Sequence, residues 1–285
     1  MSTIRTSSIF HYTRYFSNLK SILVEGLIPN FCLETFTKDS SEVYTIGIPM
    51  VSFCDIPLTR IHYFSRYGFY GIGLSKKWAM YNQVNPILYV TSRLLDNTLN
   101  DLIELKNNLE KIRSDFENDF VKDPETGRNY VNIDGSEASK RIVEWFILSK
   151  YSYDLHMNLF GFSKRAPNIL ERNSVYEENE WRYLVSNSSE SKWIWDESDY
   201  KKWRGPEEYP SGRKTPKPNS GISPLTFTVD DINYIIVKKE KQIPPLIDFI
   251  QELNIIGGSE KLLSDSDKKI LLTKIISLEV IDHDF

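Results

Sequence analysis

The stretch IFHYTRYFSNLKSILVEGLIP, residues 9–29, decides how the rest of the chain is interpreted. It opens as a predicted strand that carries His11 and Thr13 on one face, because side chains two apart in a strand point the same way. Leucine and isoleucine side chains then recur at helical spacing, with Ser17 as the expected N-cap and Gly26 as the C-terminal stop. A strand that presents a histidine and a hydroxyl just before a helix is an arrangement that can hold a ligand.

Composition excludes several classes of protein. The 285 residues are 40% hydrophobic and contain no repeat or clean linker, which favours one domain. A net charge of -4 gives no overall attraction to nucleic acid. Cys32 and Cys54 have no partners at zinc spacing, so we expect neither a metal site nor a disulfide framework. No apolar run approaches the ~20 residues needed to span a bilayer, and we expect a cytoplasmic protein without membrane contact.

The order of predicted elements indicates an α+β fold. Strands gather near both ends of the chain with helices between them, which is not the regular alternation of a parallel α/β sheet. The segments that carry this prediction are strands at 48–58, 67–74, 86–91, 230–237 and 275–280, helices at 97–121, 136–151 and 244–253, and irregular loops at 30–48 and 186–224. Residues 173–185 are expected to start as a turn and end as a strand.

Two groups of residues could carry chemistry. The sequence lacks the phosphate-binding loop, the dinucleotide glycine motif, the serine-hydrolase elbow and the zinc-protease helix motif. His11 with Thr13 forms the first group. Glu178, Glu180 and Arg182 form the second, because residues two apart in a strand share a face and an adjacent arginine favours ionised carboxylates. Each group, taken alone, is more often structural, as a satisfied histidine or a solvated acidic strand end.

The first of these groups lies in a motif that resembles the opening of ADP-ribosyltransferases. FHYTR at 10–14, followed by ILVEGL at 22–27, resembles the first motif of the poly(ADP-ribose) polymerases and of DarT-type DNA-modifying toxins. GIGLSK at 71–76 is similar to the second polymerase motif.

Over a longer part of the chain, about residues 8–240, the sequence resembles the AbiGi family of bacterial abortive phage-resistance proteins. The segments that carry this resemblance are HYT at 11–13, MVSFCDIPL at 50–58, YG at 67–68, GIGLSKKW at 71–78 and ENEWR at 178–182.

The transferase resemblance implies a particular architecture. The chain would be one ADP-ribosyltransferase-like domain over residues 1–285, built from split β-sheets with inserted helices. The helical insertion would lie at about 97–151 and a long loop at about 186–224. NAD would bind as a substrate in the cleft between the sheets, without a metal ion.

The same resemblance implies roles for the site residues. His11 would bind an NAD ribose with help from Thr13, and Arg14 would approach the pyrophosphate. Glu180 would bind the ribose 2′-hydroxyl and stabilise the oxocarbenium ion as nicotinamide leaves, and Glu178 would activate or select the acceptor.

Further cofactor-binding residues are expected around these. They are Tyr12, Ser52, Tyr67, Tyr70 and Ser75. The resemblance departs from the polymerase pattern at Gly73, which occupies the place of the tyrosine that stacks on nicotinamide. Tyr67, Tyr70, Trp78 or Tyr81 could supply that stacking surface instead.

The resemblances lead to one leading hypothesis and two alternatives. The leading hypothesis is an NAD-dependent ADP-ribosyltransferase of bacterial phage defence, which cleaves the nicotinamide–ribose bond and modifies a nucleic acid or a protein. One alternative is a non-enzymatic antitoxin or regulatory partner in a two-gene abortive-infection system, as the AbiGi family is usually labelled, with a cognate toxin as its partner. The other is an NAD glycohydrolase that releases free ADP-ribose.

Overall fold

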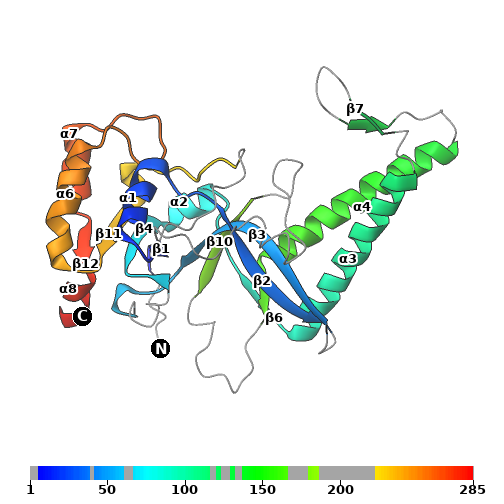
Figure 1. Ribbon diagram of the computed structural model, residues 1–285, viewed down its shortest axis with the longest axis horizontal. Coiled ribbons are helices and arrows are strands. Elements are labelled where there is room, and N and C mark those ends of the chain that lie inside the picture. Colours follow the sequence, from blue (N-terminus) through cyan, green and yellow to red (C-terminus); the bar gives the residue numbers. More distant parts are fainter. Residues whose placement is uncertain are drawn as a thin grey trace, which may run out of the picture.

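The protein has an α+β architecture, in agreement with the sequence prediction. The computed structural model describes residues 6–38, 42–60, 67–115, 120–122, 129–131, 137–165, 179–185 and 222–284. A mostly antiparallel sheet of eight strands forms the centre, with helices on both of its faces (Figure 1). None of the described helices is long and apolar enough to cross a membrane.

The central sheet has the strand order β12-β11-β4-β1-β3-β10-β5, and β2 pairs with β3 outside this path. All of its pairs are antiparallel except β11 with β12. Its strands are β1 (Ser8–Thr13), β2 (Asn30–Lys38), β3 (Glu42–Cys54), β4 (Tyr70–Ser75), β5 (Asn85–Pro86), β10 (Glu180–Leu184), β11 (Ile232–Val237) and β12 (Ile275–Ser277). Two small two-stranded sheets pair β6 (Leu88–Val90) with β9 (Ser163–Arg165) and β7 (Phe120–Lys122) with β8 (Asn129–Val131).

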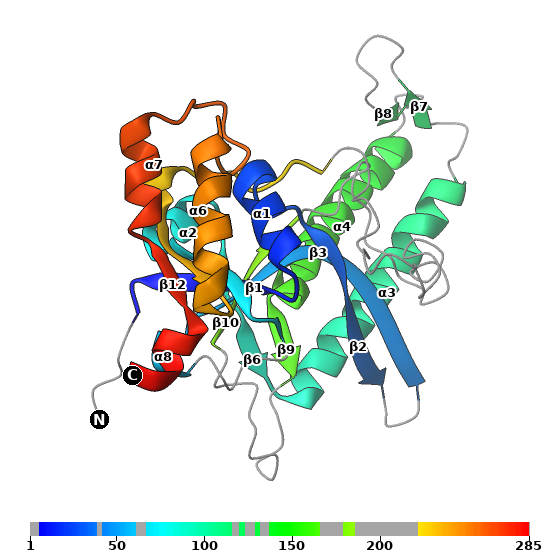
Figure 2. The same ribbon diagram turned by 60° about the vertical axis from the view of Figure 1, so that its left-hand side comes forward.

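Two groups of helices lie at opposite ends of the molecule. The described α-helices are α1 (Phe16–Glu25), α2 (Lys76–Tyr81), α3 (Ser92–Asp115), α4 (Glu137–Gly161), α6 (Ile243–Glu252), α7 (Asp265–Leu272) and α8 (Leu278–Asp284). Figures 1 and 2 show α6, α7 and α8 at one end of the molecule, and α3 and α4 side by side as a long arm at the other. We call α3 and α4 together the helical arm.

The opening stretch folds largely as its pattern predicts. It forms β1 and then α1, in which the leucine side chains at 19 and 23 are buried. Gly26 ends the helix with a φ of 84°, and a Cβ at this residue would lie 2.7 Å from the carbonyl oxygen of Leu225. The predicted N-cap is wrong, because Tyr15 occupies that position and Ser17 lies inside the helix. The helix starts two residues earlier than predicted and without a side-chain cap, so packing of its apolar face fixes the start.

Residues 30–48 contradict the predicted loop. They contribute β2 and most of β3, which form a hairpin with nine registered pairs from Asn30↔Met50 to Lys38↔Glu42. The prediction failed because the segment is polar. Two paired strands satisfy each other's backbone groups whatever the polarity of their side chains, and the threonines and phenylalanines of this segment suit a strand.

Among the strands of the central sheet, β1 and β3 share few paired residues. Only the pair Phe10↔Cys54 joins these two strands in register, whereas β1 pairs with β4 at six positions. The sheet therefore consists of two halves, β12-β11-β4-β1 and β3-β10-β5 with β2, that meet at one point.

Each face of the sheet has its own apolar core. Ile9, Val51 and Phe53 on one face pack with buried residues of α1, α2 and α6. On the other face of β3, Ile48 and Met50 pack with buried residues of the helical arm. Alternating residues of one strand thus serve two different cores.

Several other helices and strands begin or end at residues that differ from the sequence prediction. The helix predicted at 97–121 is α3, which begins earlier, whereas residues 120 and 121 belong to β7. The helix predicted at 136–151 extends to Gly161 as α4. The final strand ends at Ser277, where α8 begins. The predicted loop at 186–224 lies outside the described residues except for its last three.

Candidate functional site

His11 contacts the neighbouring strand through its ring. Its Nδ1 atom lies 2.9 Å from the backbone carbonyl oxygen of Ser52, and its ring meets Phe53 edge-on at 5.9 Å between centroids. Burial lowers the pKa of His11 and outweighs the opposite effect of the hydrogen bond to Ser52. The imidazole is therefore neutral near pH 7, with Nδ1 protonated to donate to the carbonyl.

Two other residues of the proposed cofactor site lie on the same face as His11. Thr13 is buried, and its hydroxyl accepts a hydrogen bond of 3.0 Å from the side-chain amide of Asn18. Tyr70 of β4 pairs directly with Thr13 of β1, and the Tyr70 hydroxyl accepts a hydrogen bond of 2.7 Å from Gln242. Residues that pair directly share a face, so the structure brings these three side chains to one side of the sheet.

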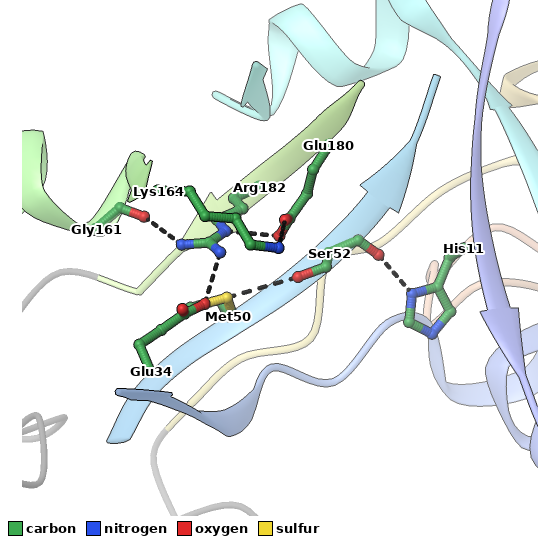
Figure 3. A network of polar contacts seen from close by, with 8 residues as sticks. All are labelled: His11, Glu34, Met50, Ser52, Gly161, Lys164, Glu180 and Arg182. Atoms are coloured by element: carbon green, nitrogen blue, oxygen red, sulfur yellow. Dashed lines mark hydrogen bonds and ion pairs between the residues drawn. The ribbon is translucent and has the colours of Figure 1, made fainter. Parts of the chain in front are cut away.

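Glu180 belongs to a separate cluster of four charged residues (Figure 3). Arg182 donates from Nε to one Glu180 carboxylate oxygen at 2.7 Å, and Lys164 donates to the other at 3.0 Å. Arg182 also donates from Nη2 to Glu34 at 2.6 Å and from Nη1 to the backbone carbonyl of Gly161 at 2.9 Å. We call Glu34, Lys164, Glu180 and Arg182 the ion-pair cluster.

The ion-pair cluster joins segments that are far apart in the sequence. Glu34 comes from β2, Glu180 and Arg182 come from β10, and Lys164 comes from β9, just after the last residue of α4. The contacts to Lys164 and to the Gly161 carbonyl therefore tie β10 to the base of the helical arm, and the contact to Glu34 ties β10 to β2.

Arg182 is the centre of the cluster. Its side chain is 1% exposed, and every donor contact just described goes to an acceptor of this chain. Burial by itself would lower the pKa of the guanidinium, but the Glu34 and Glu180 carboxylates raise it above its ordinary value. Arg182 is therefore a permanent buried cation whose charge is compensated by two acidic residues.

Glu180 is ionised for the same reason. Burial would raise the pKa of its carboxyl group, but Arg182 and Lys164 beside it lower the pKa below its ordinary value. Both carboxylate oxygens accept a hydrogen bond from a cation of the same chain. The carboxylate is thus a poor proton acceptor at neutral pH, and its immediate partners are structural.

His11 and Glu180 point to opposite faces of the sheet. Cys54 of β3 pairs with Phe10 on one side and with Glu180 on the other, so these three side chains share a face. His11 follows Phe10 in the strand and therefore projects from the other face. The structure assembles His11 with Thr13 and Tyr70, and Glu180 with Arg182, as two separate groups.

The remaining proposed site residues are distributed around these groups. Ser52 pairs with Arg182 and shares the face of the ion-pair cluster, where its hydroxyl donates to Met50 Sδ at 3.5 Å. Ser75 caps α2 and accepts a hydrogen bond of 3.1 Å from the backbone of Trp78.

Tyr12, Arg14 and Tyr67 complete the set of described candidates. Tyr12 lies on the face opposite His11, and its hydroxyl has no hydrogen-bond partner among the described residues. Arg14 and Tyr67 are exposed. Glu178, proposed as the acceptor-selecting residue, lies outside the described residues.

Glu34 and Lys164 are the residues that sequence reasoning missed. The spacing of Glu180 and Arg182 indicated their pairing, since they are two apart in a strand. No local pattern indicates that Glu34, 148 positions from Arg182, forms its other ion pair. Because 30–48 had been interpreted as a loop, this carboxylate had no predicted position.

The fold and the cluster define a class of protein: an α+β sheet protein with a helical arm held at its base by a buried ion-pair cluster. Residues 25–238 match the family model described as "Putative abortive phage resistance protein AbiGi, antitoxin". The chain therefore belongs to the AbiGi family. It is 25% identical over 258 residues to "Abortive phage resistance protein AbiGi" of Lactococcus lactis subsp. cremoris, a match that covers 87% of this chain and 93% of the relative. No solved structure matches the chain.

Proposed function

We propose that the chain acts in abortive phage resistance as a non-enzymatic antitoxin, which neutralises a cognate toxin by binding to it. The family description names an antitoxin, and the Lactococcus lactis relative carries an abortive phage resistance name. This role was an alternative in the sequence interpretation. The arrangement of the two candidate groups favours it over the transferase hypothesis.

The observation that carries the proposal is that both carboxylate oxygens of Glu180 accept hydrogen bonds from cations of the same chain. A transferase carboxylate must reach the ribose 2′-hydroxyl of NAD and face the positive charge that develops as nicotinamide leaves. The Glu180 carboxylate instead accepts from Arg182 at 2.7 Å and from Lys164 at 3.0 Å. It has the partners that a buried structural ion pair requires.

The position of His11 supports the same conclusion. Transferase chemistry by the proposed residues needs the histidine and the carboxylate at one substrate. In this fold the strand register puts His11 on the face covered by α1, α2 and α6, whereas Glu180 is on the face of the helical arm. NAD bound at either group would contact one of the two proposed residues and be separated from the other by the sheet.

Two measurements on the same set of variants test the proposal. The first is growth of bacteria that express the proposed cognate toxin, together with the wild type, His11→Ala or Glu180→Gln. The second is NAD consumption by the purified proteins. Glu180→Gln keeps the shape of the side chain and an acceptor oxygen while removing the charge, so it tests chemistry with little loss of packing.

We expect all three proteins to suppress toxicity to the same degree at matched abundance, and none to consume NAD above the buffer rate. Turnover of NAD by the wild type that disappears in Glu180→Gln, measured at a temperature at which circular dichroism shows both proteins folded, would establish the transferase or glycohydrolase hypothesis instead. Failure of the wild type to suppress the toxin would also overturn the antitoxin role.

A further inference from the structure

The helix α4 carries apolar side chains on two opposite faces. Its inner face is buried against α3 and the sheet and consists of Ser149, Tyr153, Met157 and Phe160. Its outer face carries Leu148, Tyr151, Leu155 and Leu159, which are 66%, 70%, 58% and 48% exposed. These four residues are spaced by three, four and four positions and therefore form one stripe along the helix. Trp145 and Ile147 extend it, at 53% and 45% exposed. We call these six residues the outer stripe.

The other helix of the arm shows what an ordinary solvated face looks like. The inner side of α3 is apolar and buried, as at Leu95, Leu99 and Leu102. Its outer side has one exposed apolar residue, Leu94 at its start, and is otherwise polar, as at Asn97, Asp101, Glu104, Asn107 and Lys111. Two neighbouring helices of similar length thus differ at their outer faces. An amphipathic pattern such as that of α3 suits water, whereas a helix that is apolar on both sides is typically covered on both.

The size of the outer stripe matches one half of a protein interface. Six large apolar side chains, each about half exposed, present on the order of 600 Å². A typical monomer has no larger apolar patch, and two such faces together approach the lower limit of about 1,200 Å² for a stable specific interface.

The charges near the outer stripe allow this surface to pack against the same surface of a second copy. The nearest ion pair, Lys150 with Asp154 at 2.5 Å, is internal to the helix and electrically balanced. No charged residue interrupts the stripe between Leu148 and Leu159 on its own face, and the exposed Glu144 lies on this face at the N-terminal end of the stripe. Two copies of this face can meet without placing like charges opposite each other, and an apolar centre of this kind is characteristic of homodimers.

We propose that the outer stripe is a self-association surface, through which the helical arms of two copies of this chain pack against each other. Each arm extends beyond the central sheet (Figures 1 and 2), so two arms can lie side by side while their sheets remain apart. Packing of two helix pairs forms a four-helix assembly, in which side chains spaced by three and four interlock. This assembly does not depend on the antitoxin role.

The test is the mass of the full chain in solution. Sedimentation equilibrium of the wild type should give a dimer with a dissociation constant below ~10 µM. Leu148→Lys with Leu155→Lys places two cations in the apolar stripe of each copy, and we expect the dissociation constant to rise at least ~100-fold. Both positions are exposed, so helix content and melting of the dilute protein should change little.

The matched control is Asn97→Lys with Asn107→Lys on the polar outer side of α3. It adds the same charge to the same arm and should leave the dimer intact. A wild type that remains monomeric at 100 µM would overturn the proposal, including the case in which it binds only its toxin. A stripe variant that remains dimeric would overturn it too. Should the lysine variant fail to fold, Tyr151→Ser with Leu155→Ser provides the second variant for the same measurement.

Discussion

The two faces of the sheet at β3 and β10 bury polar groups in different ways. On the face covered by α1, α2 and α6, His11 is neutral and has a single hydrogen bond to a backbone carbonyl. On the face covered by the helical arm, Arg182 and Glu180 are charged and are satisfied by several partners. A neutral ring can be buried with one partner, whereas a buried charge requires compensation on every side.

Substitutions on the two faces should therefore change stability to different degrees. Loss of His11 removes one contact within the sheet. Loss of a member of the ion-pair cluster leaves an opposite charge buried and weakens the connection between the sheet and the helical arm. The two faces should therefore respond very differently to substitution and to pH.

The largest expected effect is that of Arg182→Ala. It leaves Glu180 and Glu34 without their shared cation, and we expect a loss of about 3–5 kcal/mol in the free energy of unfolding. Urea denaturation at pH 7 measures this loss. Arg141→Ala on the exposed side of α4 is the matched control and should change stability by less than ~0.5 kcal/mol. Equal effects of the two substitutions would show that the cluster does not hold the fold.

The second effect concerns Glu180→Gln, which we expect to lower stability at pH 7 by about 1.5–3 kcal/mol through loss of charge-assisted hydrogen bonds. The folded-state pKa of Glu180 is lowered from 4.5, so its contribution is complete above that value and is lost as the pH falls through the folded pKa. The stability difference between wild type and variant should therefore be constant from pH 6 to 8 and shrink below about pH 4.5. A difference that stays constant down to pH 3 would contradict this explanation.

The smallest effect is that of His11→Gln. The folded-state pKa of His11 is lowered from 6.5, so the unfolded chain binds the proton first as the pH falls. The wild type should lose stability below about pH 6.5, by at most ~1.4 kcal/mol per pH unit from this group, until the folded pKa is reached. The variant lacks this contribution, so the free energies of unfolding of wild type and variant, measured by urea denaturation at each pH, should converge between pH 7 and 5. Parallel pH profiles would mean that the ring is not held neutral.

Apart from the N-cap of α1, the parts of the opening stretch that local pattern determines were predicted correctly from the sequence. β1, α1 and the glycine stop at Gly26 follow from strand alternation, helical spacing and a backbone angle that glycine adopts freely. The spacing of Glu180 and Arg182 likewise fixed their common face. The loop prediction for residues 30–48 was wrong because the pairing of β2 with β3, rather than the composition of the segment, makes these residues strands.

The sequence by itself thus determined the α+β class, the candidate residues and the pairing of neighbours along a strand, because each depends on contacts a few residues apart. Only the tertiary structure decided that Cys54 lies between Phe10 and Glu180, which puts His11 and Glu180 on opposite faces. It also decided that Glu34 and Lys164 complete the charge balance around Arg182 and Glu180. Strand register and long-range ion pairs arise from the packing of distant segments, and no local spacing encodes them.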